Sequence, residues 1–375
     1  MNFKVNKQMF YNALSTASRA ISSNSPVPIL IGIRIEVENG ILRITSSDAS
    51  LSIVQTLSNE QNDKLGLTIL DEGSIVIDSR YLIDIVRKID SDEISIEIID
   101  GTLTHFSGEK AEFRINGYRP SDYPTIDFSE PSTRFEMSYE LLSNVISGTA
   151  FAASVKETRP VLTGVNMRSD GEKITCTATD SFRLARKEIA LSAEPFSVTV
   201  PAKCLNEART IFAGEETIHI ALSEKKIQFR SGNTVLQSTM LEGNYPETDR
   251  LIPTAFNDDL VINRRQLLSA VDRSSFIKTD NMTIIRLEIN AADDILISCK
   301  SQEIGEYNES LNAVSYEGTP LDISFSGNYL SDALKSLSTE NVKIRFTENM
   351  KPFILVNEGG DDSILQLVLP VRTYN

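Results

Sequence analysis

The sequence predicts an α+β fold of three similar repeats, each with helices on one side of antiparallel sheets. A short strand that leads into an amphipathic helix occurs three times, as IVIDSRYLIDIVRKI, VTVPAKCLNEARTIF and ISFSGNYLSDALKSL. The matching leucines, Leu82, Leu205 and Leu330, are 123 and 125 positions apart in a chain of 375 residues. Because self-similarity at a fixed period indicates repeated structural units, three repeats account for the whole chain. We expect them at residues 1–128, 129–253 and 254–375.

A second amphipathic helix precedes this one in every repeat. FKVNKQMFYNAL, FEMSYELLSNVI and LVINRRQLLSAV carry apolar pairs four positions apart, such as Phe10 with Leu14 and Leu142 with Ile146. This spacing places both side chains on one helical face, as in a helix that packs on a core. The two patterns together predict helices at residues 7–20, 79–90, 138–152, 202–213, 263–277 and 327–338.

Strands and tight turns are expected between the helices. ISIEIID, IHIAL, DILISCK and VKIRF alternate apolar and polar residues, as half-buried strands do. Asn39-Gly40, Asp100-Gly101 and Asp170-Gly171 are dipeptides that accept the positive φ of tight hairpin turns. Asp293-Asp294 and Glu348-Asn349 occupy comparable places in the third repeat. Each repeat is therefore expected to run helix, strands, helix, strands.

The composition is that of an ordinary globular protein. Hydrophobic residues make up 41% and charged residues 24% of the chain, which argues against disorder. Neither a long uninterrupted apolar run nor a signal-peptide pattern occurs, so we expect a cytoplasmic protein with no membrane partner. Cys176, Cys204 and Cys299 are odd in number and widely spaced, which favours buried thiols over disulfides or a zinc site.

The net charge of −15 at first sight opposes nucleic-acid binding, but the distribution of charge matters more than its sum. The predicted helices contain eleven basic and six acidic residues, so they carry +5 and the strands and loops about −20. A basic helical layer would guide DNA to one surface, whereas helix propensity for Lys and Arg explains the same excess without a ligand. The eleven helix cations are Lys7, Arg19, Arg80, Arg87, Lys88, Lys203, Arg209, Arg264, Arg265, Arg273 and Lys335.

Sequence marks of catalysis and of cofactor binding are missing. No G-x-G-x-x-G, P-loop, H-E-x-x-H, EF-hand or G-x-S-x-G pattern occurs. The only histidines, His105 and His219, fall in predicted strands, where a sheet position is a simpler explanation than a general base. The carboxylates are dispersed, and no acid–base pair stands out. We therefore expect a protein without catalytic residues, metal site or cofactor.

In its longer motifs the chain resembles the β subunit of bacterial DNA polymerase III, the sliding-clamp family. TATDSFRLA in the middle repeat, GNYPETDRLIP at its end and LVLPVRTYN at the C-terminus match that family, as does the repeat spacing. The terminal VRTY form resembles members from low-GC Gram-positive bacteria. The resemblance implies a processivity factor of three clamp domains, with helices on an inner surface and sheets outside. It further implies a head-to-tail homodimer that closes as a ring around duplex DNA without reading its sequence.

The resemblance also implies an apolar groove between the middle and C-terminal domains. It would bind Gln-Leu-x-Leu-Phe-like peptides of the replicative polymerase, the clamp loader, and repair and translesion proteins. Arg183 and Arg372 would frame its rim, where charge tunes specificity. The family often has His where this chain has Phe182, which favours a stacked apolar contact over a hydrogen bond. The implied groove residues are Leu162, Thr179, Ser181, Phe182, Arg183, Leu184, Pro246, Arg250, Leu251, Tyr316, Leu367, Leu369, Pro370, Val371 and Arg372.

Further DNA contacts and the dimer interface follow from the resemblance less directly. Loops after the first helices would add Asn24, Lys156, Arg159 and Lys278 to the eleven helix cations as DNA-facing residues. The family commonly has Arg near the place of Asn24. Phe276 and Ile277 are expected at the dimer interface, as an exposed apolar pair that packs against an edge strand of the partner.

Three hypotheses about function therefore differ in what they require. The first is a clamp that encircles DNA, and the second is a clamp-like peptide-binding scaffold that does not. If light scattering shows a monomer at micromolar concentration, the result would argue against the DNA-encircling ring. The third is a hydrolase or transferase acting on nucleic acid. Metal-dependent nuclease activity on plasmid DNA would support this third hypothesis.

Overall fold

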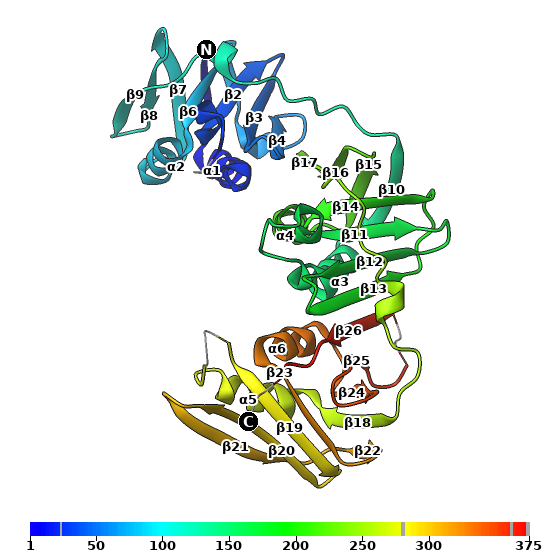
Figure 1. The fold of residues 1–375 in the computed structure, drawn as a ribbon. Helices are drawn as coiled ribbons and strands as arrows, with labels where there is room; N and C mark the ends of the chain where they lie inside the picture. The colour runs from blue at the N-terminus through cyan, green and yellow to red at the C-terminus, as the bar shows by residue number, and fades with distance from the viewer. Residues whose placement is uncertain (23–24, 279–281, 361–362, 373–375) are drawn as a thin grey trace. The chain divides into compact units, whose positions relative to one another are not determined.

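The computed structural model describes residues 1–22, 25–278, 282–360 and 363–372 (Figure 1). In these ranges six α-helices lie where the two helical patterns predict them, each ending two or three residues early. After α1 and α3 the chain continues as a 3₁₀ turn, at Ser18–Ala20 and Ala150–Ala152. The helices are α1 (Lys7–Ala17), α2 (Ser79–Lys88), α3 (Tyr139–Thr149), α4 (Ala202–Ile211), α5 (Arg264–Ser274) and α6 (Gly327–Ser336).

Polar residues at the ends of strands start three of these helices. The side chains of Asn6, Asp78 and Asn263 each accept a hydrogen bond from a backbone N–H in the first turn of α1, α2 and α5. Such N-caps satisfy donors that have no partner inside the helix.

The described strands form four antiparallel sheets. A five-stranded sheet runs β5 (Thr68–Asp71), β1 (Asn2–Asn6), β7 (Glu93–Asp100), β8 (Leu103–Ser107), β9 (Glu112–Asn116). An eight-stranded sheet runs β10 (Thr133–Ser138), β15 (Thr217–Leu222), β16 (Lys226–Ser231), β17 (Thr234–Thr239), β4 (Leu51–Ser58), β3 (Ile41–Ser47), β2 (Gly32–Glu38), β6 (Gly73–Asp78). A nine-stranded sheet runs β14 (Phe196–Pro201), β11 (Gly164–Ser169), β12 (Ile174–Thr179), β13 (Arg183–Ile189), β26 (Ile364–Val368), β25 (Phe353–Asn357), β24 (Asn341–Phe346), β18 (Asp258–Asn263), β22 (Ser315–Glu317). A four-stranded sheet runs β21 (Gly305–Leu311), β20 (Asp294–Ser301), β19 (Ile284–Ala291), β23 (Leu321–Ser326).

Each of the two large sheets joins strands of two sequence repeats. Strand β17 of the middle repeat pairs with β4 of the first, and β13 of the middle repeat pairs with β26 of the third. The chain accordingly divides into two compact units that split the middle repeat. The first unit holds residues 1–140 and 206–240, and the second holds residues 141–205 and 241–375.

Helices and sheets share the hydrophobic cores. In the first unit α1 and α2 lie side by side and bury apolar residues against strands of both of its sheets (Figure 1). Phe3 of β1 and Phe10 of α1 meet there edge to face, with ring centroids 6.2 Å apart. In the second unit α5 and α6 pack together in the same way, in a core that contains Phe325, Phe346 and Phe353. The amphipathic patterns therefore correspond to faces that are buried.

Turn residues adopt the backbone that the dipeptides predict. Asn39 and Gly40, between β2 and β3, have φ of 51° and 78°. Gly101 and Gly171 close two further hairpins, also with positive φ. His105 lies in β8 and His219 in β15, and the three cysteines are buried.

Candidate functional site

A row of apolar side chains crosses the pairing of β13 with β26. Leu184 is the cross-strand partner of Leu367, which is in turn the partner of Ile354 on β25. With Val356 these residues form a buried apolar cluster, here called the apolar floor. Leu369 packs against it as a half-buried neighbour. Because alternate residues of a strand point to one face, Ile354 and Val356 of β25 both face this surface.

The segment between β17 and β18 borders the apolar floor. Its residues Ile252 and Phe256 are half-buried against the floor, and the Arg345 guanidinium lies 4.2 Å from the Phe256 ring centroid. Leu251, at the end of the 3₁₀ turn Asp249–Leu251, stays 53% exposed. Apolar surface is therefore available next to a well-packed base, as a side-chain pocket requires.

Arg186 ties this bordering segment to β13. Its guanidinium donates to the Asp249 carboxylate at 2.5 Å and to the Thr248 hydroxyl at 3.3 Å. Burial raises the pKa of Asp249, but the hydrogen bond and charge of Arg186, helped by Arg168, outweigh burial and hold that pKa below its ordinary value. The tie is therefore intact at neutral pH.

Phe182 stands at the tip of a tight turn before β13. The Asp180 carboxylate accepts the backbone N–H of Phe182 at 2.9 Å, and the Thr179 hydroxyl accepts that of Ser181 at 3.1 Å. Ser181 has a φ of 80°, a left-handed conformation that the two hydrogen bonds support. Phe182 is 59% exposed, and its backbone carbonyl accepts a hydrogen bond from the N–H of Leu369 at 3.0 Å. The turn thus presents an aromatic ring beside the C-terminal segment.

Arg183 does not frame a rim, and that expectation is wrong. Its side chain is only 13% exposed, and it donates to Asp180 at 3.0 Å, to Asp332 at 2.6 Å and to the Phe151 carbonyl at 2.7 Å. The guanidinium also lies 4.6 Å from the centroid of the Tyr329 ring. The planar fork of Arg suits such a network, so Arg183 holds the turn in place from below.

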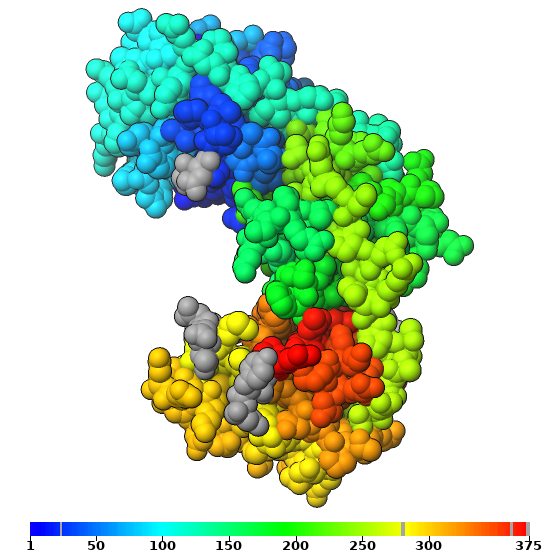
Figure 2. Space-filling model, viewed as in Figure 1, coloured from blue at the N-terminus to red at the C-terminus, as the bar shows by residue number. Residues whose placement is uncertain are grey.

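The other predicted groove residues are only partly brought together. Leu162 and Thr179 are buried, whereas Tyr316 packs against the core of the third repeat and donates its hydroxyl to the Thr319 carbonyl. Burial raises the pKa of Tyr316 to about 12. Pro246, Pro370 and Val371 are half-buried, whereas Ser181, Arg250 and Arg372 are exposed. Figure 2 shows the red, C-terminal part of the described chain at the surface.

Five residues at the floor were not predicted, namely Ile252, Phe256, Ile354, Val356 and Leu365. The FILV run of β25 is uniformly apolar, so its periodicity does not distinguish the two faces of the strand. Only the pairing of β25 with β26 reveals which side faces the floor.

At least six of the eleven helix cations are engaged by the chain itself. Arg80 binds Asp78, Arg87 and Lys88 bind Asp84, Arg19 binds Glu207, and Arg273 binds Glu309. Arg264 is half-buried, and its guanidinium donates to the carbonyls of Thr339 at 2.9 Å and Leu334 at 3.4 Å. Arg264 therefore satisfies backbone groups at and after the C-terminal turn of α6 and is poorly placed to meet a phosphate.

A smaller set of the predicted DNA-facing cations is exposed without an ion pair to a described residue. Arg265, Lys335, Lys156, Arg159 and Lys278 are exposed and form no ion pair with a residue in the described ranges. Lys203 is exposed, Lys7 and Arg209 are half-buried, and Asn24 lies outside the described residues. The charge of the exposed cations is available for weak, non-specific phosphate contacts.

The expected exposed pair after α5 is a single exposed aromatic. Phe276 is 65% exposed, but Ile277 is 2% exposed, contrary to expectation. The N–H of Ile277 donates to the Ser274 carbonyl at 3.0 Å, and its own carbonyl accepts from the Cys299 thiol at 3.5 Å. The turn that closes α5 therefore directs Ile277 inward and leaves Phe276 at the surface.

Strands β9 and β21 each have one open edge. Among the described strands β9 pairs with β8 alone and β21 with β20 alone. An unpaired edge offers free N–H and C=O groups to another chain. Within the described residues no group of His, Cys, Asp and Glu is arranged to hold a metal ion, and no helix is long and apolar enough to cross a membrane.

Comparisons with known proteins agree with this geometry along the whole chain. Family models for the N-terminal, central and C-terminal domains of the DNA polymerase III beta subunit match residues 1–127, 136–247 and 249–372. A protein of Bacillus subtilis named beta sliding clamp is 36% identical, with 100% of each chain covered. The crystal structure of the Bacillus subtilis clamp superposes with a TM-score of 0.94 at 35% identity, covering 100% of both chains. A beta chain structure from Streptococcus pneumoniae also gives 0.94 at 35% identity, covering 99% of this chain and 100% of that one.

Proposed function

Because the chain belongs to the family of DNA polymerase III beta subunits, the sliding clamps, we propose that it is a non-catalytic clamp that encircles duplex DNA and tethers other proteins. The observation that supports tethering most strongly is the apolar floor with Phe182 and Leu251 exposed beside it. Leu and Phe side chains of a short extended peptide would bind there, and pockets of this kind give specificity to such peptides.

The open edges of β9 and β21 support a head-to-tail dimer. Strands β4, β13 and β21 each end the first half of a repeat, and β9, β17 and β26 each end the second half. Inside the chain a strand that ends a first half pairs with a strand that ends a second half, as β4 does with β17 and β13 with β26. Pairing of β21 with β9 of a second copy would repeat the same contact. That contact is heterologous, and two copies would close a ring of six repeats.

A closed ring needs little affinity for DNA, because topology retains it. The exposed cations Arg265, Lys335, Lys156, Arg159 and Lys278 would supply weak phosphate contacts that exchange as the ring slides. None of these contacts requires base readout.

We expect direct DNA binding and peptide binding to be separable by mutation. Arg265→Glu should weaken binding to a short linear duplex at low salt while leaving peptide affinity unchanged, because Arg265 is exposed and outside the floor. Leu184→Ala and Val371→Ala should do the reverse. Peptide affinity would be measured by fluorescence polarisation with a labelled Gln-Leu-x-Leu-Phe-type peptide, and duplex affinity by the same method with a labelled linear duplex, on which topology cannot retain the protein.

Lys351→Glu provides a charge-matched control for Arg265→Glu, since Lys351 is also exposed and belongs to neither the predicted groove nor the predicted DNA-facing set. Equal loss of DNA binding and peptide binding in any one variant would contradict the assignment of these two properties to separate residues. No peptide binding to well-folded protein would remove the tethering site and favour a scaffold of another kind.

A further inference from the structure

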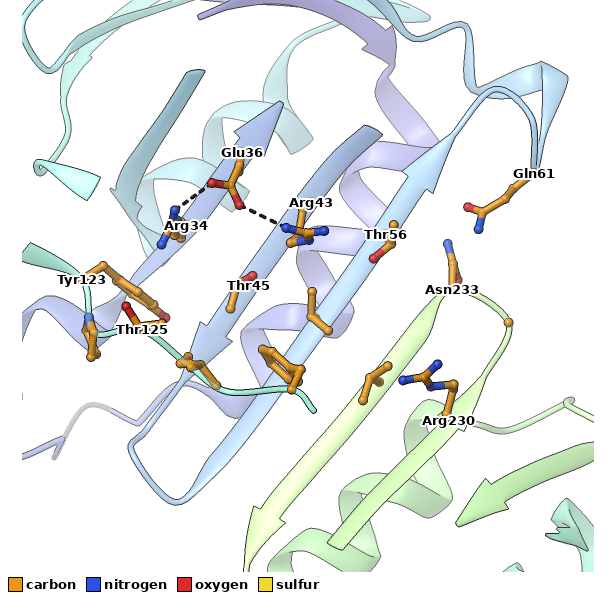
Figure 3. A pocket seen from close by; sticks show the side chains of 16 residues that line it. Arg34, Glu36, Arg43, Thr45, Thr56, Gln61, Tyr123, Thr125, Arg230 and Asn233 are labelled. Carbon is orange, nitrogen blue, oxygen red and sulfur yellow. Dashed lines mark hydrogen bonds and ion pairs between the residues drawn. The ribbon is translucent and has the colours of Figure 1, made fainter. Parts of the chain in front are cut away.

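A second groove lies in the first compact unit, at the pairing of β4 with β17 (Figure 3). It has a volume of about 550 Å³, within the range of ligand sites in proteins. One row of cross-strand partners forms its centre. Arg34, Thr45, Val54, Val235 and Arg230 follow one another across β2, β3, β4, β17 and β16. An apolar pair at the centre is thus flanked by an arginine on each side.

This groove, here called the seam groove, repeats the construction of the apolar floor. Both lie where two repeats join through antiparallel strands, and a Tyr-Pro pair opens the segment that borders each one. Tyr123 and Pro124, followed by Ile126 and Phe128, line the seam groove. Tyr245-Pro246 leads into the segment beside the floor in the same way. The two grooves share a backbone plan that suits an extended peptide.

The seam groove differs from the floor in its charge. Three arginines line it, Arg34, Arg43 and Arg230, and Glu36 is the only acid among its described lining residues. Glu36 accepts from Arg34 at 2.7 Å and from Arg43 at 3.5 Å, so one carboxylate serves two guanidinium groups. Arg230 is exposed and forms no ion pair with any residue in the described ranges. Arg34 also keeps a buried Nε without an acceptor there. The groove is therefore left with an excess of positive charge.

From this we propose that the seam groove is a second peptide site, specific for an extended acidic segment of a partner protein. One apolar side chain of the segment contacts Val54 and Val235, and carboxylates on either side of it meet Arg230 and the Arg34–Arg43 pair. Arg is the residue best suited to carboxylates because its planar fork donates two parallel hydrogen bonds. The chain has a net charge of −15, so most of its surface repels acidic peptides. The basic groove would attract them and so determine where they bind.

The test uses full-length protein and a fluorescein-labelled peptide, Glu-Asp-Leu-Asp-Glu, in polarisation titrations. We expect binding that weakens about tenfold when the four acids are replaced by their amides, and by a similar factor in Arg230→Glu. Arg230→Gln, with a smaller loss, keeps the test valid if the charge reversal disturbs folding. Lys351→Glu, at an exposed lysine of the second unit that belongs to neither site, should leave acidic-peptide binding unchanged.

The two peptide sites must also behave independently. Leu184→Ala should leave acidic-peptide binding intact, and an unlabelled Gln-Leu-x-Leu-Phe peptide should not compete for it. Equal binding of the amide peptide, no effect of Arg230→Glu, or no binding at millimolar peptide would each overturn the proposal. Full displacement by micromolar inorganic tripolyphosphate would also overturn it and assign the groove to phosphate compounds. None of these results bears on the clamp function, which the Gln-Leu-type peptide tests separately.

Discussion

Replacing Arg183 by Met should raise amide exchange at β13 by about a hundredfold, which corresponds to a local loss of about 3 kcal/mol. The side chain is 13% exposed, and it neutralises Asp180 and Asp332 while donating to the Phe151 carbonyl. Met keeps the aliphatic stem but leaves Asp180, itself 14% exposed, without its partner. Removing one member of a buried ion pair is costly because the other charge stays buried.

Hydrogen exchange is the suitable measurement, since a chain with two compact units is not expected to unfold in one step. Arg372→Met is the matched control, because Arg372 was predicted at the same groove rim and is exposed. Equal protection at Leu184 in both variants would show that Arg183 is a surface cation after all.

Two exposed phenylalanines of the second unit should separate peptide binding from dimerisation. Phe182→Ala should weaken binding of the Gln-Leu-x-Leu-Phe peptide by about tenfold to thirtyfold, as loss of an aromatic anchor does. Its turn is held by Asp180 and Thr179, so the backbone should survive the substitution. Phe276→Ala should leave peptide affinity unchanged and weaken the dimer.

Polarisation titrations and sedimentation velocity measure the two properties on the same samples. Each variant is the control for the other, since both rings are more than half exposed, at 59% and 65%. A dimer unaffected by Phe276→Ala would move the interface away from the end of α5. A peptide affinity unaffected by Phe182→Ala would remove the turn from the groove.

The elements that the sequence predicted correctly are those determined locally. The six helices follow from i, i+4 apolar spacing, and the hairpin at Asn39-Gly40 follows from the positive φ that this dipeptide accepts. Leu184 and Leu367 were identified through motifs of the family, and they do meet in the apolar floor.

The errors concern side chains whose role depends on distant partners. Arg183 was placed at the groove rim and Arg264 among the DNA-facing cations, yet each is held by groups far along the chain, Asp332 and the carbonyl of Thr339. Ile277 was placed at the surface, although the turn after α5 buries it. A count of charges in a helix cannot predict that a backbone carbonyl of another element will accept hydrogen bonds from one of its arginines. Nor does an apolar run such as FILV tell which face will be covered.

Retention on circular against linear DNA tests the clamp account most directly. The protein would be loaded by a clamp-loader complex on a nicked plasmid, passed through gel filtration at high salt, and then cut once with a restriction enzyme. We predict that it stays on the circle and is released on linearisation, because a ring holds DNA by topology and can slide off a free end. Equal retention on circular and linear DNA, or none on either, would contradict encirclement and leave a peptide-binding scaffold.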